Sequence, residues 1–199
     1  MKESLWLSGF KAMTTPILSN DIKCDVCIVG GGLSGIYSAY LLAKQGFKVV
    51  LVEAHPSIAH GATSYSTGKL TAQHAMIYSQ LSREQGEVYF QANQDAIERA
   101  VAANPPSIQR TTSYLYSATE EGKQQLIDEA NAYKKMNIPL VATNEIELGI
   151  PLSFALGMKQ QVQINPAEFT NHFALLARQA GAELFTNTRV IEIDAKEQF

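Results

Sequence analysis

The sequence predicts an α/β fold in which a nucleotide-binding unit is interrupted by an inserted α+β unit. Three observations support this. Residues 25–53 read as a strand, a glycine-rich turn, a helix and a second strand. A long irregular stretch and then a block of mixed strand and helix patterns follow. The α/β pattern resumes over residues 166–193, with a helix and two short strands.

The glycine-rich turn has the spacing that binds a dinucleotide. Gly30, Gly32 and Gly35 form a GxGxxG run between an apolar strand and a helical pattern. Gly30 permits a tight turn, Gly32 lets a pyrophosphate approach the backbone, and Gly35 lets the helix lie close to the sheet. The helix amino terminus directs N–H groups and a positive dipole end at the phosphates. These features predict a Rossmann-like βαβ unit.

An acid at the end of the second apolar run fits the same unit. Glu53 lies eighteen residues beyond Gly35, where a carboxylate accepts hydrogen bonds from an adenosine ribose. Since FAD and NAD share this ribose, Glu53 argues only against a 2′-phosphate. A nicotinamide-type domain continues promptly with another helix and strand. Here a loop rich in Gly, Ser and Thr and the inserted block come first, which favours FAD.

The other elements are predicted from caps and periodicity. Ser82 and Gln85 form a capping box for a helix over residues 83–103, and Asn165 with Pro166 begins a helix that stops at Gly181. A further helix is predicted over residues 120–136. Strands are predicted at residues 26–29, 48–52, 114–118, 141, 146–150, 158–164, 182–186 and 190–193. The predicted organisation is a first FAD-binding part over 1–75 (with an arm over 1–23), an inserted part over 76–163, and a return over 164–199.

Composition excludes several classes of protein. A chain of 199 residues with 46% hydrophobic content can bury a core as one large domain or two small ones. Its net charge of −3 argues against nucleic acid as a partner, and no apolar run is long enough to span a bilayer. Cys24 and Cys27 are spaced C-x-x-C, but we expect buried free thiols in the first strand, not a redox or metal pair. With no signal peptide, these features suggest a cytoplasmic protein.

On these residues the chain resembles a known family. The GxGxxG run, Glu53, the loop 60–64 and the run 67–74 are similar to FAD-dependent oxidoreductases of the D-amino-acid oxidase, glycine oxidase and sarcosine oxidase superfamily. The loop and the run resemble more particularly a bacterial subgroup that carries a C-terminal Rieske [2Fe-2S] domain. Members of the superfamily are considerably longer. We therefore expect this chain to be an N-terminal fragment, truncated at the C-terminus, with any iron–sulfur cluster in the missing part.

The resemblance implies roles for individual residues. The implied cofactor contacts are Gly30, Gly32, Leu33, Ser34 and Gly35 at the pyrophosphate; Glu53 and Ala54 at the adenosine end; Gly61, Ala62, Thr63 and Ser64 on a loop that approaches the flavin; Thr67, Gly68 and Lys69 toward the isoalloxazine ring; and Val190 at the adenine. Two residues of the run 67–74 are candidates for catalysis. Lys69 either stabilises reduced flavin or is a solvated loop lysine, and His74 either positions substrate or caps the next helix. No residue is assigned to a metal.

The resemblance implies transfer of hydride from a small amine or amino-acid substrate to flavin N5. Two alternatives stay open: an FAD- or adenine-nucleotide-binding fragment or subunit without turnover of its own, and an NAD-dependent dehydrogenase. The inserted block would form one wall of the substrate pocket. Tyr114 and Tyr116 either line that wall or pack beneath it, and we expect packing. The expected partners are a small-molecule substrate and either the C-terminal portion or an electron-transfer protein.

Overall fold

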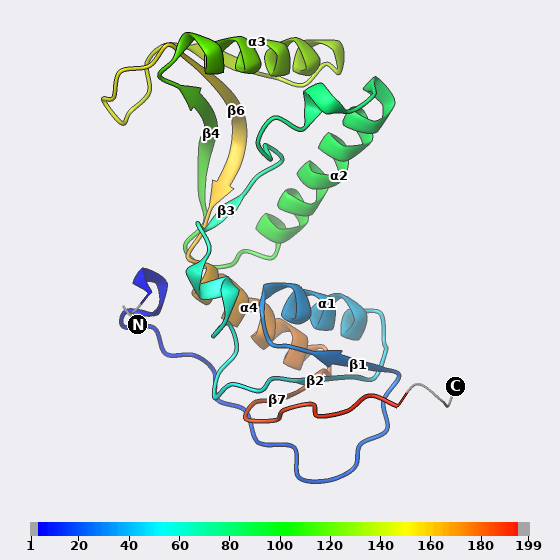
Figure 1. The fold of residues 1–199 in the computed structure, drawn as a ribbon. Helices are drawn as coiled ribbons and strands as arrows, with labels where there is room; N and C mark the ends of the chain where they lie inside the picture. Colours follow the sequence, from blue (N-terminus) through cyan, green and yellow to red (C-terminus); the bar gives the residue numbers. More distant parts are fainter. Residues whose placement is uncertain (1–3, 195–199) are drawn as a thin grey trace. The chain divides into compact units, whose positions relative to one another are not determined.

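The computed structural model describes residues 4–194 and divides into two compact units (Figure 1). Unit 1 comprises, within these residues, 4–68, 105–107 and 165–194, and unit 2 comprises 69–104 and 108–164. The first change of unit falls between Gly68 and Lys69. The predicted domain boundaries at residues 75 and 163 stay predictions. Residues 69–75, predicted with the first part, group with unit 2 by their contacts.

Unit 1 contains a parallel three-stranded sheet in the order β1-β2-β7. Its strands are β1 (Val26–Val29), β2 (Val49–Val52) and β7 (Glu183–Phe185). The helices α1 (Leu33–Lys44) and α4 (Pro166–Gln179) lie side by side over this sheet (Figure 1). Tyr37 of α1 meets Phe173 of α4 edge to face, with ring centroids 4.8 Å apart. The central strand β2 is buried along its whole length, as expected for a strand with partners on both sides.

The ends of the unit 1 helices follow the predicted cap chemistry. The Asn165 side-chain oxygen accepts hydrogen bonds from the N–H groups of Ala167 and Glu168, at 3.0 and 3.3 Å. Gly46 and Gly181 follow the two helices with φ of +90° and +100°. This left-handed conformation is the one that terminates a helix and that glycine adopts without strain. The caps predicted for both helices are confirmed.

The prediction that both cysteines are buried in the first strand is wrong. Cys27 and Val29 are exposed, and Cys24 is only partly covered. Within the described residues β1 pairs with β2 alone and forms an edge of the sheet. An apolar run predicts that a strand can be buried, but a neighbouring strand or covering layer must be present to bury both of its faces.

Unit 2 is an antiparallel sheet with β6 at its centre. Strand β6 (Phe154–Gln163) pairs with β3 (Lys69–Leu70), β4 (Gln109–Ser117) and β5 (Val141–Thr143). The helices are α2 (Arg83–Ala102) and α3 (Glu120–Lys135). The predicted capping box of α2 is present at Ser82 and Gln85. The buried core contains Ala72, Tyr78, Ala130, Ala132, Tyr133, Met136, Ile138, Leu156 and Met158.

Two predicted strands are wrong. Residues 146–150 form a loop, because Gly149 has φ of +61° and Pro151 lacks the N–H that a ladder needs. Residues 190–193 have no ladder partner in the described part of the chain. Conversely, β4 and β6 are longer than predicted, because pairing between them extends over residues that have no apolar alternation of their own.

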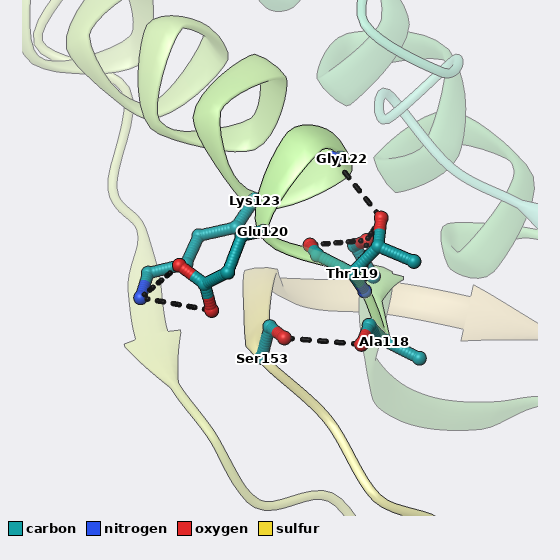
Figure 2. Close-up of polar contacts among 7 residues, drawn as sticks. Ala118, Thr119, Glu120, Gly122, Lys123 and Ser153 are labelled. Carbon is teal, nitrogen blue, oxygen red and sulfur yellow. Dashed lines mark hydrogen bonds and ion pairs between the residues drawn. The ribbon is translucent and has the colours of Figure 1, made fainter.

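The turn from β4 into α3 is held by side-chain caps (Figure 2). The Thr119 hydroxyl accepts a hydrogen bond from the Gly122 N–H at 3.2 Å, which caps the helix amino terminus. Lys123 Nζ lies 3.1 Å from Glu120 Oε2 on the first turn. Ser153 Oγ donates to the Ala118 carbonyl at 3.1 Å, which ties the residues before β6 to the end of β4. None of the helices within residues 4–194 is long and apolar enough to cross a membrane.

Candidate cofactor site

The glycine-rich turn in unit 1 has the conformation that its sequence predicts. Gly30 has φ of +108°, and its N–H donates to the Val52 carbonyl at 2.8 Å. A Cβ built on Gly35 would lie 2.1 Å from the Gly30 carbonyl oxygen, so helix α1 starts directly against the turn. No side chain fits there unless the backbone moves. The turn therefore presents bare backbone at the amino terminus of α1.

The Glu53 carboxylate reaches back to this turn. Glu53 Oε2 accepts a hydrogen bond from the Gly31 N–H at 2.6 Å, and Oε1 accepts one from the His55 N–H at 2.7 Å. His55 Nδ1 lies 3.1 Å from the same Oε1, and the Glu53 side chain is only 13% exposed. A carboxylate has about four acceptor positions, so the two oxygens can still accept from ribose hydroxyls. This geometry fits the adenosine end of FAD.

Gly31 is a site residue that the sequence analysis missed. A Cβ at this position would lie 3.1 Å from Glu53 Cβ and 3.2 Å from Glu53 Oε2. The GxGxxG pattern treats position 31 as variable, so only contact with Glu53 shows that a small residue is needed there. The available signal was the run of three consecutive glycines in a chain that also carries an acid after the second strand.

The second predicted loop reaches the amino terminus of α1. Thr63 Oγ1 accepts a hydrogen bond from the Leu33 N–H at 2.9 Å, and a Cβ on Gly32 would lie 3.2 Å from the same oxygen. The first N–H groups of a helix have no acceptor within the helix. Gly32, the N-cap residue of α1, has no side chain to supply one. The structure thus brings Gly32, Leu33 and Thr63 together.

Ser64 has a structural contact inside this loop. Its side chain is buried, and its hydroxyl donates to the Ala59 carbonyl. The Ala59 N–H in turn donates to the Gly31 carbonyl at 2.9 Å. Ser4 Oγ donates to the Ser64 carbonyl from the N-terminal segment. The loop is therefore fixed to the glycine-rich turn through its backbone, and Gly61, Ala62 and Thr63 remain the residues of this group best placed at its surface.

The segment that leads to Val190 is fastened to Glu53. The Thr188 N–H donates to the Glu53 carbonyl at 2.8 Å, and the Asn187 N–H donates to the His55 carbonyl at 2.9 Å. Val190 follows two residues after Thr188 and is partly buried. The ring of His55 stacks on the ring of His60, with the ring centroids 4.5 Å apart. Ala54 lies between Glu53 and His55, so the predicted adenosine-side residues share one part of unit 1.

Lys69 and His74 belong to unit 2, whereas the glycine-rich turn and Glu53 belong to unit 1. Lys69 is an exposed residue of β3 that pairs with Gln163, directly after Gly68 with φ of +68°. His74 Nδ1 lies 2.7 Å from the Tyr89 hydroxyl oxygen on α2. Within residues 4–194 there is no group of three or more His, Cys, Asp or Glu side chains that could hold a metal ion.

The run 71–74 before α2 is anchored within unit 2. The Ala72 N–H donates to Gln161 Oε1 at 2.7 Å, and the Tyr78 hydroxyl donates to the Ala72 carbonyl at 2.7 Å. Gln73 Nε2 donates to the Leu156 carbonyl at 3.0 Å. The sequence run that resembles the family therefore has a clear structural role in joining β3, β6 and the residues before α2.

Tyr114 and Tyr116 do not both pack beneath the sheet, and that prediction is wrong. Tyr116 is 50% exposed, and both rings line a hollow on unit 2. The β6 residues in the core of unit 2, Leu156 and Met158, pair with Leu115 and Ser113 of β4. Tyr114 and Tyr116 instead pair with Gly157 and Ala155, so they project from the other face of the sheet.

Comparison with known proteins identifies the family. The model for "FAD dependent oxidoreductase", the DAO family, matches residues 25–198. The chain belongs to this family. FAD is the family's cofactor, so the match decides between the FAD and NAD readings that Glu53 left open.

Two curated relatives share sequence with the chain. The putative Rieske 2Fe-2S iron-sulfur protein YhfW of Bacillus subtilis (strain 168) is 33% identical over 98% of this chain and 40% of its own length. Gamma-glutamylputrescine oxidoreductase of Escherichia coli (strain K12) is 49% identical over 27% of this chain and 12% of its own length. The chain thus spans less than half the length of these relatives.

Solved structures share the fold. Glycine oxidase from Geobacillus kaustophilus superposes with a TM-score of 0.71 at 24% identity, covering 87% of this chain and 49% of that one. L-amino acid deaminase from Proteus vulgaris superposes with a TM-score of 0.68 at 20% identity, covering 93% and 45%. At these identities the likeness shows the fold alone, and the α/β FAD-binding architecture predicted from the sequence is confirmed.

Proposed function

We propose that this chain binds FAD through unit 1 and belongs to an oxidoreductase that takes hydride from a C–H bond next to an amine. One observation carries the proposal. The Glu53 carboxylate is held by the Gly31 and His55 N–H groups beside the amino terminus of α1, whose N-cap residue Gly32 has no side chain. The carboxylate would accept hydrogen bonds from a ribose, and the helix amino terminus would bind a phosphate. A βαβ unit that binds no nucleotide needs neither of these features.

Different residues of unit 1 would contact different parts of the cofactor. The Gly32 and Ser34 N–H groups, with the α1 dipole, would bind the pyrophosphate. The Leu33 N–H already donates to Thr63 Oγ1, so Leu33 would approach the pyrophosphate together with Thr63. Glu53 would accept from the ribose, with Ala54 and Val190 at the adenosine end. Gly61, Ala62, Thr63 and Ser64 would pass the pyrophosphate, and Thr67 and Gly68 would lead toward the flavin. Thr63, whose oxygen already accepts from the Leu33 N–H, keeps its own O–H to donate to an anionic oxygen.

Bound FAD would supply the hydride acceptor, its N5. The chain's own residues would exclude water, orient the substrate and place charge. Lys69 would place a cation near the flavin, and His74, fixed by Tyr89, would orient substrate or flavin through its other ring nitrogen. Both roles remain proposals.

The relatives suggest a substrate class and an electron acceptor. Glycine oxidase, L-amino acid deaminase and gamma-glutamylputrescine oxidoreductase are all named for amines or amino acids, so we place the substrate in that class. The iron–sulfur name of YhfW supports electron transfer to an iron–sulfur centre in the remainder of the protein or in a partner. Two free cysteines fit a reducing cytoplasm.

The test is reconstitution of the purified chain with FAD, followed by removal of unbound cofactor and measurement of visible flavin absorbance. We expect retained flavin in the parent chain and reduced retention in Glu53→Ala, with NAD failing to compete. A colourless protein would contradict the proposal. If flavin is retained and the protein expressed from the full gene still gives no anaerobic bleaching with amines or amino acids, the alternative of a binding subunit without turnover would stand instead.

A further inference from the structure

A hollow of about 240 Å³ lies on unit 2, separate from the residues assigned to the cofactor. Its lining comes from β4 and from the loop between β5 and β6. The lining residues are Thr111, Thr112, Tyr114, Tyr116, Ile146, Glu147 and Leu148. Since Thr112, Tyr114 and Tyr116 alternate along one strand, their side chains project from the same face.

The position of the Tyr114 ring in the hollow depends on a glycine in the neighbouring strand. Tyr114 pairs with Gly157 of β6, and a Cβ on Gly157 would lie 2.6 Å from Tyr114 Cε1 and 3.1 Å from Thr112 Cγ2. The Tyr114 ring therefore lies over the backbone of β6, where only glycine leaves room for it. Tyr116 pairs with Ala155, another small residue, and half of Tyr116 is exposed. A small residue therefore lies opposite each of the two tyrosines.

The loop that completes the hollow is tied down at both ends. At its start, the Glu145 N–H donates to Thr143 Oγ1 at 3.1 Å. At its end, the Ser153 N–H donates to the Ser117 carbonyl at 2.8 Å, and Ser153 Oγ donates to the Ala118 carbonyl, as Figure 2 shows. Leu148 is nevertheless 66% exposed. An apolar side chain held at the rim of an aromatic hollow is available to contact a ligand.

The charged and aromatic side chains that line the hollow indicate the charge of the ligand that it would bind. Glu147 is the one ionisable carboxylate among the seven lining residues, and none of them is basic. Tyrosine faces attract cations, and a nearby carboxylate adds to that attraction. The same groups repel a carboxylate ligand. The hollow is therefore complementary to a positive charge carried on an apolar stem.

We propose that this hollow binds an organic ammonium group with an aliphatic or aromatic stem, the kind of cation that a protonated amine provides. The inference rests on the proposed function, in which the substrate is an amine or amino acid. It goes further by assigning recognition of the cation to Glu147 and the two tyrosines. The resemblance placed the tyrosines at a pocket wall without a chemical role and gave Glu147 none.

The test is an NMR chemical-shift titration of the 199-residue chain with benzylammonium, benzyl alcohol and benzoate. We expect saturable shifts at Thr112, Tyr114, Tyr116 and Leu148, with affinity falling in the order benzylammonium, benzyl alcohol, benzoate. Glu147→Gln should weaken benzylammonium binding about threefold to tenfold and leave benzyl alcohol unchanged. The matched control is Glu145→Gln, which removes an exposed acid outside the lining and should change neither affinity.

A second variant tests whether the position of the Tyr114 ring matters for binding. Gly157→Ala should displace the Tyr114 ring and weaken both benzylammonium and benzyl alcohol. If that variant fails to fold, the comparison of Glu147→Gln with Glu145→Gln still decides, because both acids are exposed. Benzoate binding as tightly as benzylammonium, equal effects of the two glutamate variants, or no saturable shift in the hollow would each overturn the inference.

Flavin uptake by the same samples separates this inference from the proposed function. Retained flavin without saturable ammonium binding would refute the ammonium site alone. Ammonium binding without flavin retention would refute the proposed function while leaving the hollow as a cation site.

Discussion

The Gly31 N–H donates a 2.6 Å hydrogen bond to Glu53 Oε2, which joins the glycine-rich turn to the acid at the end of the second strand. The contact spans twenty-two positions in sequence and holds the carboxylate against the glycine-rich turn. It depends on the absence of a side chain at residue 31, because any Cβ there would press on Glu53.

Replacing Gly31 with alanine should therefore displace Glu53. We expect a loss of about 1 kcal/mol in the free energy of unfolding, from the weakened hydrogen bond, together with lower flavin retention. Urea unfolding and the ratio of flavin to protein absorbance measure the two effects. Ser38→Ala, on an exposed position of α1, is the control and should change neither. Full flavin retention in Gly31→Ala would show that Glu53 tolerates the added methyl group.

Thr63 should behave as a helix cap supplied by a distant loop. Thr63→Val keeps the size but removes the oxygen that accepts from the Leu33 N–H, so unit 1 should lose about 1 kcal/mol of stability. Thr63→Ser keeps the oxygen and should restore most of the loss. Urea unfolding, monitored by circular dichroism, gives the free energy of unfolding of each variant. Equal stability of the valine and serine variants would rule out capping by Thr63.

Glu129 should be important for the stability of unit 2. Its carboxylate is fully buried and accepts from the Tyr78 and Ser79 N–H groups at 2.9 and 2.7 Å. In Glu129→Gln one of these N–H groups would face the amide NH₂, which cannot accept a hydrogen bond. The buried donor left without an acceptor should lower the free energy of unfolding by about 2–3 kcal/mol. Glu121→Gln on the exposed side of the same helix is the matched control. Thermal unfolding of the two variants side by side checks the difference, and equal midpoints would contradict it.

Unit 2 should lose stability at alkaline pH. Burial raises the pKa of both Tyr78 and Tyr133, and neighbouring phenol groups and Glu129 add to the effect at Tyr78. The folded state therefore favours the neutral phenols. Their contribution is fully present below the unfolded-chain pKa of about 10 and is lost as the pH rises above it. Urea midpoints across this range should fall, and less steeply in Tyr133→Phe; an identical slope in that variant would contradict the assignment.

Cys27 should react slowly for an exposed thiol. Partial burial and the neighbouring Cys24 raise its pKa, so a smaller fraction is the reactive thiolate at about pH 8. In Cys24→Ser one of the two causes is removed, and alkylation of Cys27 by iodoacetamide should be faster at that pH. Mass spectrometry of timed samples measures the rates, with the urea-unfolded chain as the reference. Equal rates in the folded parent chain and the unfolded chain would contradict the shift.

The sequence alone predicted the parts whose chemistry is local. GxGxxG, the Asn165 cap, the Ser82 capping box and the glycines after α1 and α4 each depend on a few consecutive residues, and the structure confirms them. The position of Glu53 after a fixed-length βαβ unit also follows from local spacing. For the same reason, family membership could be expected from the first third of the chain.

Contacts between distant residues could not be predicted in this way. The exposure of Cys27 depends on β1 having a single strand partner within residues 4–194. The need for glycine at Gly31 depends on where Glu53 folds back, and the open Tyr116 ring depends on the strand opposite. A residue's own backbone preferences are encoded beside it in the chain. Its burial and its partners are set by segments that only folding brings near, so tertiary structure alone decided them.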